Sequence, residues 1–147
     1  MTTGGDYEGT SGFAGLAVVW QESISLVKEI YAVTRSLPDD EKFGLTSQMR
    51  RAAVFVPRNI AEGAARGSQR EFAQFLVMAR GSLSERETQI IIAKELNYLT
   101  ETARIEAIIN SIFRLLGGRL NNVRKKSPLD SCVTAHLSPF TTYCLPS

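Results

Sequence analysis

The sequence predicts an all-α protein that folds as an antiparallel up-down-up-down four-helix bundle. Four long segments place apolar residues three and four positions apart, which is the spacing of one helix face, and no segment alternates as a strand does. The loops between these segments are short, and short connections join antiparallel neighbours. A chain of 147 residues suits one domain with one core. We expect the bundle to span 13–126, between a disordered segment at 1–12 and a flexible tail at 127–147.

The first predicted helix runs from about Phe13 to Ser36. Pro38 follows this helix closely. A proline lacks the amide hydrogen and pushes the residue before it out of helical geometry, so the helix must end before Pro38. The side that we expect to face the core consists of Leu16, Trp20, Val27 and Tyr31.

The second predicted helix covers about Asp40 to Glu62 and carries two stripes on adjacent sides. The apolar stripe, at steps of three and four, consists of Leu45, Met49, Ala52, Val56 and Ile60. The polar stripe, together with one acid from the third helix, is predicted to form a hydrogen-bonded seam that fixes the contact between helices or subunits. A functional pocket built from the same groups is the alternative. The predicted seam consists of Gln48, Arg51, Asn59, Glu62 and Glu87.

The third predicted helix begins at Gln69, because Ser68 and Glu71 have the spacing of a capping box. It ends at Asn97 or Tyr98. Its predicted core side consists of Phe72, Leu76, Ala79, Leu83, Ile90 and Ala93. A glycine at position 81 costs a helix about 1 kcal/mol relative to alanine, so we expect another backbone to pack closely there.

The fourth predicted helix runs from about Thr100 to Lys126. Its apolar residues again follow helical spacing, and we expect Gly117 and Gly118 to be its weak point. The predicted core side consists of Ile105, Ile108, Ile109, Ile112, Leu115, Leu116 and Leu120.

Charge is unevenly distributed although the net charge is only +2. Residues 1–41 hold two basic and seven acidic side chains, whereas 50–70 hold five arginines and one glutamate. A further four basic side chains, without an acid, lie within 119–126. Concentrated basic charge is typical of proteins that bind a polyanion. Solvated helix faces with ion pairs between subunits are the alternative interpretation.

Eight basic residues are the candidates for contacts with nucleic-acid phosphates. Two of them, Arg66 and Arg70, flank the predicted start of the third helix, where free amide groups favour anions. Aromatic residues are scarce beside the candidates in the sequence, so we expect recognition of the nucleic-acid backbone rather than of bases. The full set is Arg50, Arg58, Arg66, Arg70, Arg119, Arg124, Lys125 and Lys126.

Catalytic, metal and targeting patterns are weak in this sequence. Ser82 does not lie in the glycine-flanked turn of a nucleophile elbow. In the tail, Cys132, His136 and Cys144 would supply three ligands, whereas a closed zinc site takes four. We therefore expect no catalytic residue, no metal and no cofactor. Without a signal peptide or an apolar run long enough for a bilayer, the expected compartment is the cytoplasm and no membrane is expected.

Several motifs occur in a specific order between residues 18 and 99: LTSQMRRAA, a proline, NIAEG, FAQFL and GSLSERETQ. In this combination the chain resembles the four-helix-bundle proteins encoded in intervening sequences of bacterial 23S rRNA genes, over about Val18 to Leu120. One departure is the stretch FVPRNIAEG, where such proteins usually read SIPSNIAEG. It adds bulk at Phe55 and a positive charge at Arg58.

The resemblance implies a protein that associates with itself as a homopentameric ring. A distant relative is the accessory variability protein of diversity-generating retroelements, a basic pentamer that partners a reverse transcriptase and nucleic acid. By this resemblance the chain is a non-enzymatic accessory that binds RNA or DNA, with a reverse transcriptase or another nucleic-acid enzyme as a candidate partner. The alternative is a protein-interaction scaffold whose charged seams serve only self-assembly or a protein partner.

Overall fold

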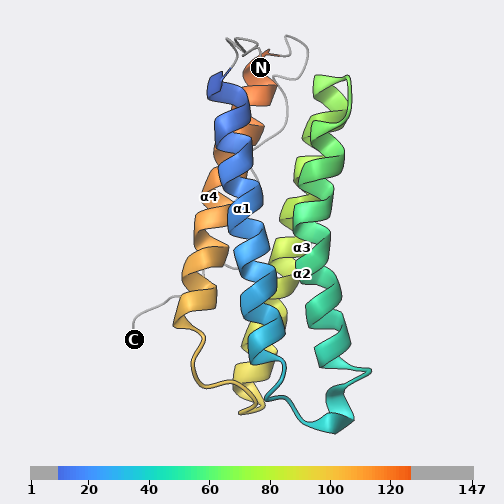
Figure 1. Ribbon diagram of the computed structural model, residues 1–147, viewed down its shortest axis with the longest axis vertical. Coiled ribbons are helices and arrows are strands. Elements are labelled where there is room, and N and C mark those ends of the chain that lie inside the picture. The colour runs from blue at the N-terminus through green and yellow to red at the C-terminus, as the bar shows by residue number, and fades with distance from the viewer. Residues whose placement is uncertain (1–9, 127–147) are drawn as a thin grey trace, which may run out of the picture.

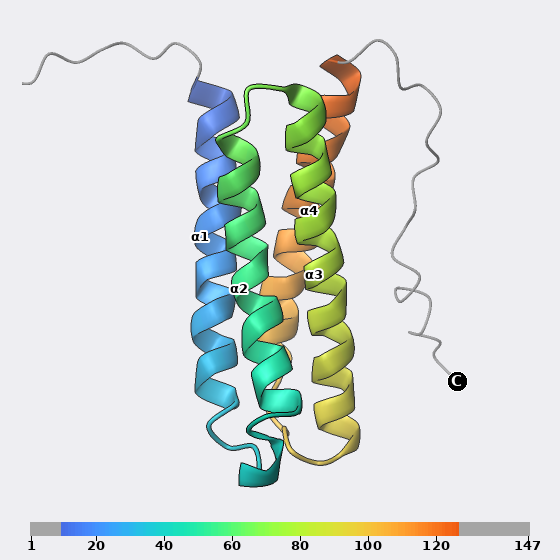
Figure 2. The ribbon, with the colours of Figure 1, turned by 90° about the vertical axis from the view of Figure 1, so that its right-hand side faces the viewer.

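Residues 10–126 are described by the computed structural model, and every regular element among them is helical, which confirms the all-α prediction. The elements are α1 (Thr10–Val33), the 3-10 turn η1 (Asp39–Glu41), α2 (Leu45–Ala64), α3 (Gln69–Glu95) and α4 (Ala103–Lys126). In Figures 1 and 2 the four α-helices lie along one long axis, and successive helices run in opposite directions. The candidate ligands Cys132, His136 and Cys144 lie outside the described residues.

Each helix packs against two neighbours in the described chain. α2 lies between α1 and α3, and α4 closes the arrangement by contacting both α3 and α1. The diagonal pairs, α1 with α3 and α2 with α4, are not in contact within the described residues. One core therefore runs down the centre of the bundle, as expected for four amphipathic helices. No helix among residues 10–126 is long and apolar enough to cross a membrane.

The first two helices differ from their predicted bounds. α1 begins at Thr10, within the segment predicted to be disordered, and it ends at Val33 rather than at Ser36. α2 begins at Leu45 rather than at Asp40, because Asp39–Glu41 forms a separate 3-10 turn. The Glu41 carboxylate then accepts a hydrogen bond of 2.9 Å from the Leu45 amide. Glu41 thus stabilises the positive end of α2, as expected of an acid there, but it lies in the preceding 3-10 turn and not in the helix itself.

The capping prediction for α3 is confirmed. Ser68 accepts a hydrogen bond of 3.3 Å from the Glu71 amide, and the helix begins at Gln69. It ends at Glu95, slightly before the predicted end, because Asn97 adopts a left-handed conformation with φ of 58°. The Tyr98 amide then donates to the Ala93 carbonyl at 2.9 Å, and the Asn97 amide donates to the Lys94 carbonyl at 2.9 Å. These bonds form a Schellman motif with asparagine in the position that favours glycine.

The predicted core faces of α2, α3 and α4 are confirmed. The fully or nearly fully buried side chains include Met49, Val56, Ile60, Leu76, Ala79, Leu83, Ile90, Ala93, Ile105, Ile109, Ile112, Leu116 and Leu120. The other predicted members are buried as well or pack partly buried against this core: Leu45, Ala52, Phe72, Ile108 and Leu115. Helical spacing therefore identified the buried side of these three helices.

The predicted core face of α1 is confirmed only for Leu16 and Val27, which pack partly buried against the core. Trp20 and Tyr31 are both 42% exposed, and the fully buried side consists of Val19, Ser23, Leu26 and Ile30. This helix is apolar on several sides, so more than one stripe fits the spacing. A serine within the true stripe obscured it. Because Ser23 donates a hydrogen bond of 2.6 Å to the Trp20 carbonyl, its hydroxyl is satisfied inside the core.

The close approach predicted at Gly81 does not occur within the described chain, where a Cβ on this glycine would meet no atom within 4 Å. The tight contact lies instead at Gly63, which is buried in the last turn of α2. A Cβ there would lie 2.7 Å from the Cβ of Phe75 on α3. The missing side chain of Gly63 therefore lets α2 and α3 pack together.

Candidate nucleic-acid interface

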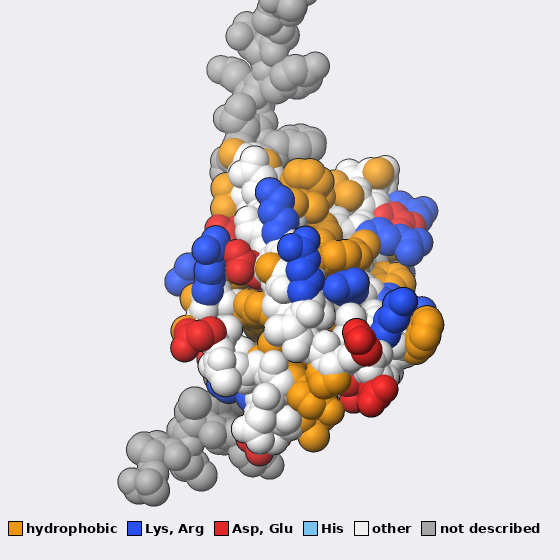
Figure 3. Space-filling model, turned by 60° about the horizontal axis from the view of Figure 1, so that its bottom comes forward, with side chains coloured by type: hydrophobic (Ala, Val, Ile, Leu, Met, Phe, Trp, Pro, Cys, Tyr) orange, Lys and Arg blue, Asp and Glu red, His pale blue; other side chains and the backbone are white. Residues whose placement is uncertain are grey.

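An open hollow lies on the face that α1 and α2 form. It has a volume of about 420 Å³ and is lined by Tyr31, Arg50, Arg51, Val54, Phe55 and Arg58. We call this site the arginine hollow. Three guanidinium groups and two aromatic rings line it, and among residues 10–126 no carboxylate does. Figure 3 shows Lys and Arg side chains gathered in the middle of one face of the molecule, with hydrophobic side chains among them.

Helical spacing explains why five of these residues meet. Positions 50, 51, 54, 55 and 58 differ by one, three and four, so they project from one side of α2, next to the buried stripe that contains Met49 and Val56. The buried stripe fixes the rotation of α2 and thereby holds the arginines on the surface. Tyr31 completes the hollow from α1, because the core side of α1 carries Ile30 and so leaves Tyr31 facing outward.

Arg50 is held in a defined position. Its Nε donates a hydrogen bond of 2.9 Å to the Thr34 hydroxyl, and its Cζ lies 4.9 Å from the centroid of the Tyr31 ring. The Thr34 hydroxyl is itself buried and donates to the Ile30 carbonyl at 2.7 Å. A guanidinium carries five N–H groups, so four remain for a ligand. Arg50 is therefore a positioned cation and not a freely moving surface charge.

Arg58 is also placed by an aromatic ring. Its Cζ lies 5.3 Å from the centroid of the Phe55 ring, one helical turn earlier on α2. Arg66 has a similar neighbour, with its Cζ 4.9 Å from the Phe75 ring. The expectation that aromatic residues are scarce beside the arginines is therefore wrong. The spacing of three between Phe55 and Arg58 could have revealed one pair. Arg50 and its ring lie on two helices, and the pair of Arg66 and Phe75 joins the α2–α3 connection to α3, so local spacing shows neither pair.

The structure separates the eight candidate residues into two zones. Arg50 and Arg58 line the arginine hollow, whereas the α2–α3 connection and the end of α4 lie together at one end of the bundle in Figures 1 and 2. That end carries the remaining described candidates, of which Arg119 lies against Gly15 of α1. The side chain of Lys126 lies outside the described residues. The second zone consists of Arg66, Arg70, Arg119, Arg124 and Lys125.

The α3 N-terminus is less free for an anion than the sequence predicted. Arg66 forms an ion pair of 2.9 Å with Glu62, and both side chains are about 40% exposed. Ser68 already accepts from the Glu71 amide in the first turn of α3. The carboxylate of Glu62 therefore offsets the charge of Arg66, although an exposed pair of this kind contributes little to stability. Arg70 is exposed at the start of the helix.

The five residues of the predicted polar seam do not lie in one interior network of the described chain. Gln48 and Arg51 are exposed, and Arg51 lines the arginine hollow. Asn59 is buried, whereas Glu62 pairs with Arg66 at the surface. Glu87 is half-buried, and burial first, then the nearby Glu106 carboxylate, raises its pKa. Their predicted role in a contact between subunits stays a prediction.

A buried charged network that the sequence analysis missed lies elsewhere on α3. Arg86 is fully buried, its Nη1 donates to the Gln89 side chain at 2.6 Å, and Gln89 donates to Glu85 at 3.1 Å. The Nε and Nη2 of Arg86 have no hydrogen-bond partner within the described residues. Burial lowers the pKa of Arg86 to about 9. Helical spacing from Leu83 and Ile90 places Arg86 on the core stripe of α3. That spacing could have revealed from the sequence that Arg86 is buried.

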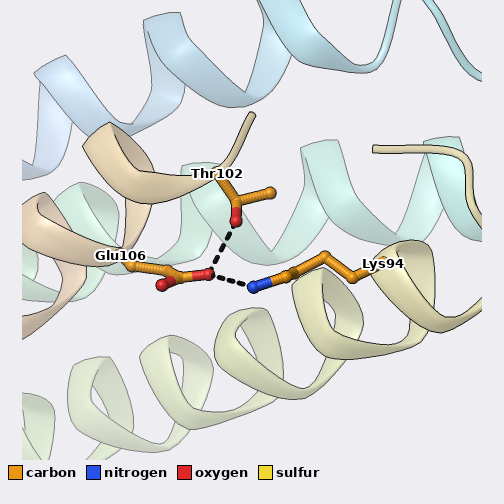
Figure 4. Close-up of polar contacts among 3 residues, drawn as sticks. All are labelled: Lys94, Thr102 and Glu106. Atoms are coloured by element: carbon orange, nitrogen blue, oxygen red, sulfur yellow. Dashed lines mark hydrogen bonds and ion pairs between the residues drawn. The ribbon is translucent and has the colours of Figure 1, made fainter. Parts of the chain in front are cut away.

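A second polar cluster joins the end of α3 to the start of α4 (Figure 4). One carboxylate oxygen of Glu106 accepts hydrogen bonds from Lys94 at 2.9 Å and from the Thr102 hydroxyl at 2.7 Å. The hydrogen bond from Thr102 first, then that from Lys94, lowers the pKa of Glu106. This cluster links α3 to α4, and each of its three side chains has a hydrogen-bond partner within the cluster. Among the described residues no group of three potential metal ligands occurs.

The fold and this surface define a class: a small all-α protein with four helices and a basic hollow on one face. Residues 17–118 match the model of the 23S rRNA-intervening sequence protein family, and the chain belongs to this family. The predicted family is therefore confirmed.

One similar solved structure is that of a protein of unknown function from the S23 ribosomal protein family of Bacteroides thetaiotaomicron VPI-5482. It shares 21% sequence identity with this chain at a TM-score of 0.62, over 75% of this chain and 98% of that one. At this identity the likeness supports the fold alone. No curated protein matches the chain.

Proposed function

We propose that the protein is a non-enzymatic, self-associating accessory factor of the cytoplasm that binds RNA or DNA through backbone phosphates. The observation that carries this proposal is the arginine hollow, where Arg50, Arg51 and Arg58 surround one open space that no carboxylate of the described chain lines. Like charges repel when they are brought together, so such a cluster is most favourable with an anion among them. Arginine suits phosphate because its planar fork donates two parallel hydrogen bonds.

Self-association as a homopentameric ring is the second part of the proposal. The side of α3 opposite its core residues carries large apolar side chains that are between 43% and 51% exposed: Val77, Met78, Ile91, Ile92 and Leu96. They form two groups, Val77 with Met78, and Ile91 and Ile92 with Leu96, with Gly81, Ser84, Glu85 and Thr88 between them on the same side. We call the two groups together the apolar stripe, and exposed apolar groups of this kind are typical of a protein contact surface. Each subunit of a ring would bring one arginine hollow, and linked sites bind a long polyanion more tightly than separate ones.

The proposal predicts salt-dependent binding of short RNA or DNA. Replacing Arg50, Arg51 and Arg58 together by glutamine should lower affinity and reduce the slope of log K against log salt by about two, since each released counterion contributes roughly 0.7 to 0.9. Fluorescence anisotropy at several salt concentrations measures both quantities. The matched control is Arg114→Gln, an exposed arginine on α4 outside the hollow, which should leave the slope nearly unchanged.

Two results contradict the proposal. The first is the absence of salt-sensitive binding at micromolar protein. The second is equal affinity and slope for the triple variant and the wild type, with circular dichroism showing that both are folded.

A protein-interaction scaffold is the second candidate function, and the exposed apolar stripe of α3 is the observation that favours it. In this alternative the stripe and the charged groups hold subunits or a partner protein, and nucleic acid plays no role. A reverse transcriptase or another nucleic-acid enzyme is the class of protein partner that we propose for either function. The salt titration separates the two functions, because a scaffold shows no affinity for oligonucleotides.

A further inference from the structure

We infer that the arginine hollow takes single-stranded nucleic acid, with a base packed against its aromatic rings and the neighbouring phosphates on its arginines. This inference rests on the proposed function and specifies the form of its ligand. It follows from the juxtaposition of rings and guanidinium groups in one open space.

The aromatic rings are available to a ligand. Tyr31 is 42% exposed and Phe55 is 37% exposed. The exposed Val54 belongs to the same lining. A hollow that held phosphate alone would need no apolar surface. Exposed rings beside cations instead match a ligand with a flat apolar part and an anionic part, and a nucleotide unit has both.

The arginines extend the stacking surface. Arg50 lies over the Tyr31 ring at 4.9 Å and Arg58 lies near the Phe55 ring at 5.3 Å. A guanidinium in this position is held by the ring and still has N–H groups for a phosphate. One ring and one arginine thus form a unit that can contact a base and the adjacent backbone, and the hollow contains two such units.

The form of the nucleic acid follows from which surfaces each form exposes. In a duplex the faces of the bases are covered by their neighbours, so rings on a protein surface have nothing to stack on. In a single strand the faces are accessible, and stacking contributes roughly 1–3 kcal/mol for each base. Among the described residues no amide or carboxylate side chain lines the hollow, and its arginines are assigned to phosphates rather than to base edges, so weak sequence preference is expected.

The test compares ring variants with the arginine variant. The ring variants are Tyr31→Leu and Phe55→Leu, which keep an apolar side chain at exposed positions, and the matched control is Phe43→Leu. Phe43 is 89% exposed and has Lys42 at 5.7 Å from its ring, but it lies outside the hollow. Anisotropy is measured with a labelled 12-nucleotide RNA, alone and annealed to its complement, and light scattering reports the mass of every variant.

We expect each ring variant to bind the single strand between about 5-fold and 100-fold more weakly than the wild type. Its salt slope and its affinity for the duplex should stay at the wild-type values, because the arginines are intact. Phe43→Leu should bind like the wild type.

Three results overturn the inference. If the ring variants bind the single strand like the wild type while the arginine variant binds weakly, stacking is wrong and the proposed function stands. If the ring variants change the mass of the particle, the rings form a contact between subunits and not a ligand site. If the wild type binds neither form, the proposed function fails and the inference fails with it.

Discussion

The environment of Arg86 lowers the stability of the folded protein. Its side chain is fully buried, and two of its three nitrogens have no partner in the described chain. A buried charge with incomplete hydrogen bonding loses more in desolvation than it regains from its contacts. The network with Gln89 and Glu85 therefore lowers stability rather than raising it. Such a network instead favours one defined packing of α3.

We predict that Arg86→Met makes the protein more stable by about 1–4 kcal/mol, because an apolar side chain of similar length replaces the buried charge. Urea unfolding followed by circular dichroism measures the change in the free energy of unfolding. Leu83→Met, a volume-conserving change one turn away on the same stripe, should change stability by less than about 1.5 kcal/mol. A less stable Arg86→Met variant would show that the guanidinium is satisfied in solution.

The same residue predicts a pH dependence. Burial lowers the pKa of Arg86 to about 9, well below the ordinary pKa of an arginine in the unfolded chain, so between these two pKa values the unfolded state binds more protons than the folded state. The free energy of unfolding therefore rises with pH above about 9. Below that pH Arg86 is charged in both states, and its burial lowers stability in full. The stability advantage of Arg86→Met should shrink between pH 8 and pH 10. An advantage that stays constant over this range contradicts the assigned pKa.

At the scale of elements, the sequence predicted best what spacing within one helix determines. The stripes of α2, α3 and α4 were confirmed, and so was the Ser68 cap, because each rests on spacing within one element. The stripe predicted for α1 was rotated to a neighbouring side, because that helix is apolar on several sides, and so Trp20 and Tyr31 were wrongly placed in the core. This error also hid the candidate site, since the outward position of Tyr31 is what completes the arginine hollow. Contacts between helices, such as that of Arg50 with Tyr31, are set by packing that local spacing does not contain.

Two glycines give a matched test of how the helices pack. Gly63→Ala should destabilise the protein by about 1–3 kcal/mol, because the new Cβ would lie 2.7 Å from the Phe75 Cβ and force α2 and α3 apart. Gly81→Ala should stabilise it by up to about 1 kcal/mol, because its Cβ meets open space in a helix. Urea unfolding measures both. Equal effects of the two substitutions would contradict the packing described at Gly63.

At the scale of the whole molecule, the two proposed surfaces do not overlap. The arginine hollow lies on the face of α1 and α2, whereas the apolar stripe lies on the outer side of α3. Among the described residues, no side chain of α3 lines the hollow. A subunit contact through α3 therefore leaves the hollow open to a ligand. A ring built in this way would present several hollows to one strand of nucleic acid.

The central claim is that the protein is a self-associating particle that binds nucleic acid, and the solution mass tests it most directly. One subunit has a mass of 16.2 kDa, so a pentamer has a mass of about 81 kDa, which is five times that value. Light scattering at low salt should report this mass for the protein alone and a larger mass after a single-stranded 12-nucleotide RNA is added. A mass of one subunit that does not change with RNA would contradict the account.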